Sequence, residues 1–274
     1  MGSIYSFNLD GLTELRAEAM TILADGFVEH DSKTLATLHD YYPKNDVEHL
    51  AEIGSIVAKM KRFGEERPSA RPRLHAEILA SVAAVVRITE AEVALDVGCG
   101  EGLLLRALAH EARIRHLVGV DTDEVQIGAA NALLNLLPEQ ERQKITLKSM
   151  DVASVGKVLA EGRSAITAVE VIEHIPDTNW IRKLFDFYPD ILVATTPNRD
   201  FNSLYPEFSV AGGLLANGLR HPDHRFEFTR EEFKDWANTH ADEQGYTATL
   251  LPIGPTDIEH GSSAQMAVFQ KLNP

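Results

Sequence analysis

The sequence predicts an α/β fold with a mostly parallel sheet, helices on both faces, an antiparallel edge hairpin and a helical N-terminal extension. From residue 93 onwards, short apolar runs alternate with helical stretches, which is the pattern of β–α–β units that build a parallel sheet. Two late apolar runs, residues 246–254 and 264–272, follow each other without a helix between them. Such neighbouring strands are expected to pair antiparallel at one side of the sheet.

The chain divides into a helical N-terminal extension, residues 1–64, and an α/β domain, residues 65–274. Residues 12–30 and 46–63 space their apolar side chains three and four apart, as amphipathic helices do. "GEERPSARPR" (64–73) holds two prolines and a glycine, which predicts a linker or an ordered surface loop. "LHAEILASVAAVV" (74–86) is predicted to be a further helix.

The α/β domain has a predicted order of strands and helices. A first strand begins at residue 93 and leads into the glycine-rich stretch "LDVGCGEG" (95–102). The later strands are predicted at residues 116–123, 144–151, 165–171 and 190–197, and the helices at 103–112, 124–137, 178–188 and 229–244. The two late strands then complete the sheet.

Composition limits the classes of function. The net charge is −15, whereas proteins that bind long duplexes are usually basic at least locally. The visible basic run is residues 59–73, and charge alone favours a solvated helix end there. We expect no membrane span and no secretion signal. The single cysteine, Cys99, excludes an internal disulfide and fits a cytoplasmic or nuclear protein.

The glycine-rich stretch lies where a doubly wound, Rossmann-like fold places its ligand loop, after the first strand and before a helix. Gly98 and Gly100 would let the backbone approach a ligand closely. No Gly-Lys-Ser/Thr follows, so this is not a phosphate-binding P-loop. Glu101 would repel a pyrophosphate at the helix N-terminus, which argues against a dinucleotide.

A nucleoside ligand without phosphates fits these strand ends better. Asp96 is placed to meet a cationic or hydroxyl-bearing group, and Asp121 ends the second strand, where a carboxylate binds ribose hydroxyls. The third strand ends with Ser149, Met150 and Asp151, which are predicted to bind the cofactor, with Asp151 placed to meet an adenine amine. S-adenosylmethionine (SAM) is the nucleoside ligand that these residues favour as cofactor. The stretch "LDVGCGEG" also resembles the glycine loop of class I methyltransferases, and this resemblance implies a Rossmann-like SAM-dependent methyltransferase fold.

The stretch "VEVIEHIP" (169–176) places Glu170, Glu173 and His174 at the end of the fourth strand, on the ligand edge of the sheet. Crowded carboxylates and an imidazole repel and desolvate one another unless a cation joins them. Their oxygen and nitrogen atoms suit Mg²⁺ or Mn²⁺ better than a structural zinc. "LRHPDHRFEFTREEF" (219–233) offers His221 and His224 as a further ligand.

The motifs "VEVIEHI", "TTPNRDFN" (195–202) and "HPDHRFEFTREEFKDWA" (221–237) resemble the small-RNA 3′-terminal 2′-O-methyltransferases over roughly residues 90–271. The resemblance implies that Glu170, Glu173, His174 and His224 hold a divalent metal, with His224 favoured over His221. It further implies that the substrate is the 2′-hydroxyl of the last nucleotide of a small RNA. Arg225 and Phe228 stand where the family usually has lysine and tryptophan.

Three alternatives stay open from the sequence. A metal-dependent O-methyltransferase acting on a small-molecule diol would use the same catalytic set, and the acidic charge favours it. A non-catalytic SAM-fold protein would instead bind a protein partner through residues 1–64. Finally, His174 and His224 would be structural if they did not bind a metal.

Overall fold

The computed structural model describes residue 16, residues 70–151, residue 154, residues 162–204 and residues 218–272. The predicted N-terminal extension therefore lies outside the described residues apart from Arg16, as does most of the basic run 59–73. The described elements, in chain order, are α4 (Ala70–Ile88), β1 (Val93–Val97), α5 (Leu103–Ala109), β2 (His116–Asp121), α6 (Glu124–Leu134), α7 (Glu139–Arg142), β3 (Ile145–Ser149), β4 (Ser164–Val169), η3 (Ile172–His174), η4 (Thr178–Ile181), α8 (Arg182–Phe185), β5 (Ile191–Pro197), η5 (Arg199–Leu204), α9 (Arg230–Gln244), β6 (Tyr246–Asp257) and β7 (Gly261–Lys271).

The sheet has seven strands in the order β3-β2-β1-β4-β5-β7-β6. The first five of these are parallel, and β7 pairs antiparallel with both β5 and β6. The predicted mostly parallel sheet with an antiparallel hairpin at one edge is thereby confirmed. The order reverses between β1 and β4, and a doubly wound sheet binds its ligand at this reversal, outside the carboxyl ends of the strands.

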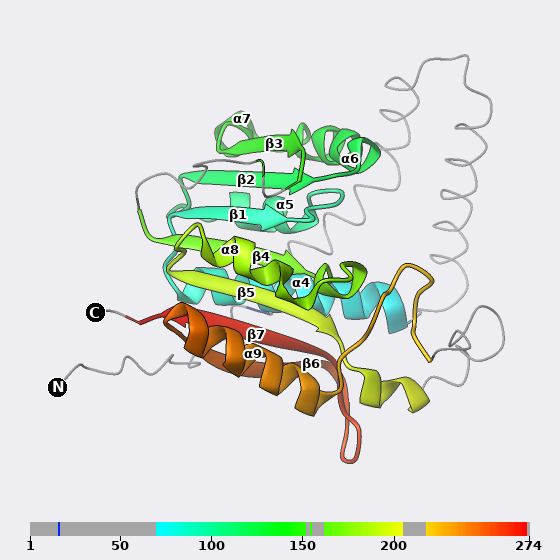
Figure 1. Ribbon diagram of the computed structural model, residues 1–274. Helices are drawn as coiled ribbons and strands as arrows, with labels where there is room; N and C mark the ends of the chain where they lie inside the picture. The colour runs from blue at the N-terminus through cyan, green and yellow to red at the C-terminus, as the bar shows by residue number, and fades with distance from the viewer. Residues whose placement is uncertain (1–15, 17–69, 152–153, 155–161, 205–217, 273–274) are drawn as a thin grey trace.

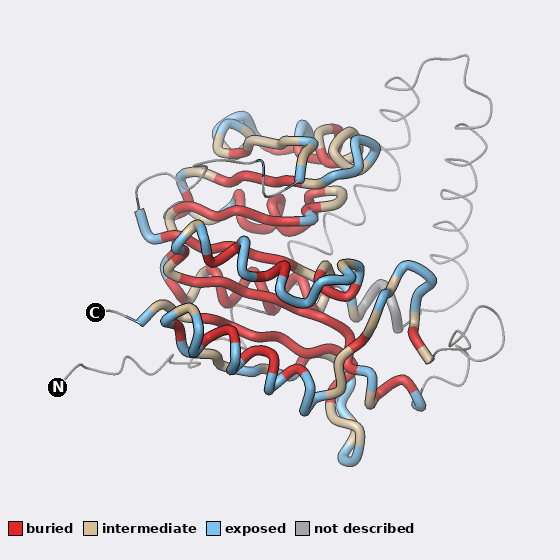
Figure 2. Tube along the Cα trace, viewed as in Figure 1, coloured by how far each residue is buried: buried red, intermediate tan, exposed pale blue. Residues whose placement is uncertain are grey.

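Helices cover both faces of the sheet and enclose two apolar layers (Figure 1). One layer is formed by α4, α5 and α6 with one face of the strands, and the other by α8 and α9 with the opposite face. Strands β1 and β5 are buried at every residue, so their apolar residues do not alternate with exposed polar ones, and the polar residues they contain, Asp96, Thr195 and Thr196, are buried as well. Figure 2 shows this burial along the central strands, with exposed residues on the outer sides of the helices and in the loops.

Local sequence explains where the helices begin and end. The Thr229 side chain accepts from the backbone N–H of Glu232, whose own side chain accepts from Thr229, and this capping box starts α9. Gly245 then ends α9 in the left-handed conformation, with φ 75°. Asp123 caps α6 by accepting from the backbone N–H of Val125.

Two predicted elements need correction. The predicted linker 64–73 overlaps α4, which already begins at Ala70, and Pro72 is compatible with the first turn of a helix. The predicted helix 178–188 is instead a short 3₁₀ turn followed by the four-residue α8. Tyr188 takes a positive φ of 51° directly before Pro189, and this ends the helical path early.

None of the helices in the described ranges combines the length and the apolar composition that a bilayer crossing requires.

Candidate metal and cofactor site

The glycine loop connects β1 to α5 and lies against the segment that follows β4. Gly98, Gly100 and Gly102 have φ values of 69°, 50° and 78°, a region that favours glycine. A Cβ on Gly98 would lie 2.6 Å from Cγ2 of Val171. The loop therefore needs glycine at position 98 both for its turn and for its contact with the residues after β4.

Asp121 ties the glycine loop to the end of β2. One carboxylate oxygen accepts from the Gly100 N–H at 2.9 Å, and the other accepts from the Asp123 N–H at 3.0 Å. An ionised carboxylate has about four lone-pair positions, so Asp121 keeps capacity for ligand hydroxyls. The predicted ribose contact stays a prediction, and the bond to the glycine loop adds a structural reason for a carboxylate here.

Asp96 lies inside the sheet, 3% exposed, between β2 and β4. Its Oδ1 accepts from the hydroxyl of Thr167 at 2.7 Å. Burial raises the pKa of Asp96 to about 7, although the Thr167 hydrogen bond acts in the opposite direction. A carboxyl with this pKa is half-protonated near neutrality, and its predicted contact with a ligand remains a prediction.

The predicted adenine-binding residues lie beside Asp121. Ser149 pairs with Asp121 in the register of β2 and β3, and the Met150 N–H donates to the Asp121 carbonyl at 2.9 Å. Ser149 and Asp151 are exposed, and Met150 packs partly against the core layer formed with α8 and α9. These three residues and the glycine loop therefore occupy one edge of the sheet, as predicted.

Glu170 and Glu173 follow β4 and are each held by one threonine of β5. Glu170 takes a positive φ of 53°, and its Oε1 accepts from the Thr195 hydroxyl at 3.0 Å. Glu173 is fully buried, and its Oε2 accepts from the Thr196 hydroxyl at 3.1 Å. The two adjacent threonines of "TTPN" thus connect β5 to both carboxylates.

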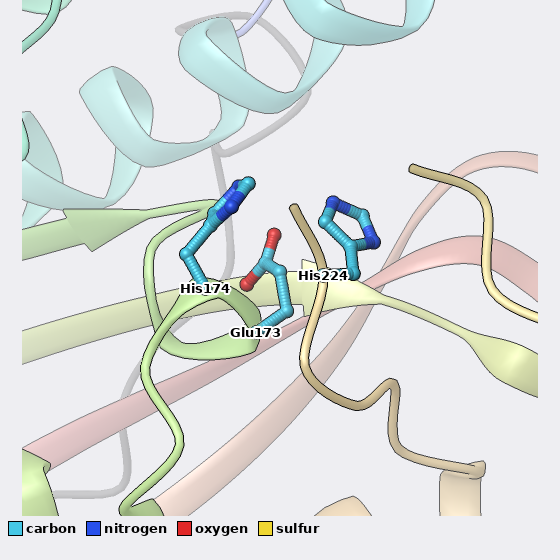
Figure 3. A group of neighbouring side chains, drawn as sticks. All are labelled: Glu173, His174 and His224. Atoms are coloured by element: carbon cyan, nitrogen blue, oxygen red, sulfur yellow. The ribbon is translucent and has the colours of Figure 1, made fainter. Parts of the chain in front are cut away.

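His174 and His224 come from separate segments and meet beside Glu173. His174 ends η3, and His224 lies in the loop before α9. Their ring centroids are 4.8 Å apart with the planes at 84°. One ligand atom each of Glu173, His174 and His224 lies within 4.8 Å of the others, and Figure 3 shows the carboxylate between the two imidazoles.

Glu170 and His221 lie near this group without joining it. The Glu170 carboxylate is bonded to Thr195 and interacts electrostatically with His224. His221 is 5.4 Å from His224 between ring centroids, and its side chain is 53% exposed. The structure therefore assembles Glu173, His174 and His224, and it leaves Glu170 at the margin as a further ligand candidate.

The electrostatics of the group favour an added cation. Burial raises the pKa of Glu170 to about 7, and burial followed by the charge of Glu170 raises the pKa of Glu173 well above its ordinary value. Burial and the neighbouring rings of His224 and His221 lower the pKa of His174. Within the described part of the chain, Oε1 of Glu173 is buried without a hydrogen-bond partner. Since an unpaired buried carboxylate oxygen is costly, this donor set fits a divalent ion.

Sequence reasoning gave no role to Glu227, three positions after His224. Glu227 is 1% exposed, and its Oε1 lies 2.6 Å from Nδ1 of His224. Burial alone would raise the pKa of Glu227, but hydrogen bonds from His224, Asn202 and the Arg220 N–H hold that pKa below its ordinary value. The available signal was a carboxylate within the "DHRFEF" motif, close to a proposed ligand.

Comparison with known proteins gives the class first. A family model described as "Methyltransferase domain" matches residues 61–242, and the chain belongs to this family. The sheet order and the glycine loop agree with that class, whose methyl donor is SAM. The sequence-based prediction of a Rossmann-like methyltransferase fold is confirmed.

Individual relatives and solved structures define the family within this class more closely. The small RNA 2′-O-methyltransferase of Xenopus tropicalis is 32% identical over 213 residues, which are 73% of this chain and 56% of that protein. The solved methyltransferase domain of bacterial CtHen1 is 33% identical with a TM-score of 0.60, covering 72% of this chain and 99% of that domain. The small RNA methyltransferase HEN1 structure, 24% identical with a TM-score of 0.62 over 74% of this chain and 26% of that one, shares the fold.

The chain therefore belongs to the Hen1-type small-RNA 2′-O-methyltransferase family, as the sequence motifs predicted. It spans about half the length of the curated vertebrate relatives it matches.

Proposed function

We propose that this chain transfers the methyl group of SAM to the 2′-hydroxyl of the 3′-terminal nucleotide of a small RNA, with a divalent metal ion at Glu170, Glu173, His174 and His224. The observation that carries the proposal is the unpartnered buried oxygen of Glu173 beside two histidines. It lies at the same sheet edge as the glycine loop. The names of the relatives, which specify small RNA, support the substrate.

The residues on the cofactor side would position SAM at the reversal between β1 and β4. The glycine loop offers a backbone surface without side chains at Gly98 and Gly100, and Asp121 retains acceptor positions for ribose hydroxyls. Ser149–Asp151 would enclose the adenine beside Asp121. Since Val171 contacts Gly98, the cofactor loop and the carboxylate–histidine group share one wall of the site.

The residues on the substrate side would hold the metal and the end of the RNA. When bound, Mg²⁺ or Mn²⁺ would lower the pKa of a ribose hydroxyl and favour a vicinal diol as substrate. Thr195 and Thr196 hold Glu170 and Glu173 by single hydroxyl donors, which leaves other lone pairs of both carboxylates available. A requirement for adjacent free 2′ and 3′ hydroxyls would explain selectivity for the 3′ end.

The decisive assay is methyl transfer from labelled SAM to a short RNA. The RNA is supplied with an intact 3′ end, with a 2′-deoxy 3′ end, or after periodate oxidation, each with Mn²⁺, with Mg²⁺ or with a chelator. We expect transfer only to the intact end and only with metal. Transfer to a small-molecule diol and to none of the RNAs would contradict the RNA assignment.

Variants of the histidines test the proposed ligands. His224→Ala removes a proposed ligand and is expected to abolish transfer, whereas His221→Ala is the matched control, because its exposed ring lies outside the group of three. Equal loss in both variants would contradict the assignment of His224. Activity retained in His224→Ala and in Glu173→Ala would favour a structural role for these residues.

Docking of a protein partner by residues 1–64 and a location in the cytoplasm or nucleus are part of this proposal. The location is supported by Cys99, which is free and buried in the glycine loop.

A further inference from the structure

Glu227 is a buried carboxylate on which three hydrogen-bond donors converge. Its Oε1 lies 2.6 Å from Nδ1 of His224 and accepts from the Arg220 N–H at 2.7 Å, while its Oε2 accepts from Nδ2 of Asn202 at 2.7 Å. Glu227 itself is almost completely shielded from water, with 1% of the residue exposed. Its carboxylate is therefore held from both sides.

The neighbours of Glu227 are themselves fixed in one orientation. The Asn202 amide donates to the Gly218 carbonyl at 3.0 Å and to Glu227, and its oxygen accepts from Nε of Arg220. Arg220 also donates to the Asn198 carbonyl at 2.7 Å. The orientation of Glu227 is thus determined by η5 and by the loop before α9, before any ligand binds.

The contact with Glu227 determines which nitrogen of His224 carries a proton. The Arg220 N–H and the Asn202 NH₂ can only donate, so both Glu227 oxygens act as acceptors. Nδ1 of His224 is then the donor in this contact. In the neutral ring the lone pair then lies on Nε2, and a neutral imidazole binds a metal through the nitrogen without the proton.

We propose that Glu227 is a positioning residue that holds His224 as the Nδ1–H tautomer, with Nε2 as the metal-binding atom. The role in metal binding rests on the proposed function, but the tautomer is a property of the protein without metal. Glu227 itself contacts neither substrate nor cofactor in this scheme.

An isosteric variant separates this role from simple packing. In Glu227→Gln, one side-chain oxygen becomes an NH₂ group, which would face either the Asn202 NH₂ or the donors on His224 and Arg220. In either orientation two donor groups face each other. With the NH₂ toward His224, Nδ1 of His224 loses its acceptor; with the NH₂ toward Asn202, the contact that orients the new side chain is lost. Glu227→Ala removes the contact altogether, and Glu231→Gln is the control, because Glu231 is an exposed carboxylate at the start of α9.

Two measurements on the full chain test the proposal. Long-range ¹H–¹⁵N spectra of the metal-free protein report the His224 tautomer, with the signals assigned by comparison with His224→Ala. Mn²⁺ titration followed by electron paramagnetic resonance reports affinity from the signal of the free ion. We expect Nδ1–H in wild type, a mixed or reversed tautomer in Glu227→Gln, and a roughly 10- to 100-fold rise in the Kd for Mn²⁺. Glu231→Gln should match wild type in both.

Wild-type tautomer and wild-type Mn²⁺ affinity in both Glu227→Gln and Glu227→Ala would overturn the proposal, as would an Nε2–H tautomer in the wild-type protein. Circular dichroism checks the fold, and if Glu227→Ala does not fold, the isosteric variant carries the test. Absence of Mn²⁺ binding in the wild type would refute the metal part of the proposed function. The tautomer spectra would then still decide whether Glu227 controls the ring.

Discussion

Replacing Asp96 with asparagine should stabilise the protein at alkaline pH and do so much less at acidic pH. Asp96 is 3% exposed, and burial raises its pKa from 3.8 to about 7. A folded state with the higher pKa binds the proton more tightly than the unfolded state does, so stability falls as pH rises from the unfolded to the folded pKa. Asparagine keeps an oxygen to accept from Thr167 and carries no charge to desolvate.

The size of the effect follows from the two pKa values. The pKa of Asp96 rises from 3.8 in the unfolded state to about 7 in the folded state. At 1.36 kcal/mol per pKa unit, this shift lowers the free energy of unfolding by ~4 kcal/mol at pH values above both pKa values. At pH 5, which lies between the two pKa values, only the smaller part of this loss of stability has occurred. The stability advantage of Asp96→Asn over wild type should therefore grow by roughly 2–3 kcal/mol between pH 5 and pH 8.5.

Urea denaturation of the cofactor-free protein at the two pH values measures this difference. Asp186→Asn is the control, because it removes the same charge from an exposed position at the end of α8. An advantage of Asp96→Asn that is equal at both pH values, or larger at pH 5, would refute the reasoning about burial.

Three further variants test the packing around the site. Gly98→Ala places a side chain at φ 69° and in contact with Val171. We expect a loss of ~1–3 kcal/mol in the free energy of unfolding by urea denaturation and weaker SAM binding by calorimetry. Adding Val171→Ala should recover only part of the stability, and full recovery would exclude backbone strain. Thr196→Val removes the hydroxyl that donates to Glu173. In thermal melts it should lower stability by about 1–3 kcal/mol in the presence of a chelator and by less with saturating Mn²⁺. Equal losses under both conditions would argue against a metal at Glu173. Tyr246→Phe removes a buried hydroxyl that donates at 2.7 Å to a backbone carbonyl before β5, and a loss of about 1 kcal/mol is expected at every pH from 6 to 9.

Burial explains which elements the sequence predicted well. The strands β1, β4 and β5 are almost entirely enclosed, so each appears in the sequence as a short, mainly apolar run without the alternation of a half-exposed strand. The helix predicted over 178–188 was wrong in type, because its periodicity is similar to that of a 3₁₀ turn joined to one α-helical turn. Periodicity alone does not show the positive φ of Tyr188.

The sequence predicted which residues form the candidate metal site, but it predicted only some of the contacts between them. Glu173, His174 and His224 come together as the motifs indicated. The donors that hold the carboxylates depend on the register of β4 against β5, which places Val169 opposite Thr195. A single sequence does not contain that register. The pairing of His224 with Glu227 likewise depends on how the loop before α9 folds back.

The position of β7 between β5 and β6 affects how a newly synthesised chain reaches its folded state. Thr195 of β5 pairs with Met266 of β7, so this side of β5 stays unpaired until residues 261–271 have been synthesised. Before β7 is synthesised, all four proposed metal ligands are already part of the nascent chain. At that stage β5 is an open apolar edge with unpaired backbone donors and acceptors. Such an edge favours pairing with other chains, so the nascent protein passes through an aggregation-prone stage that lasts until β7 is inserted.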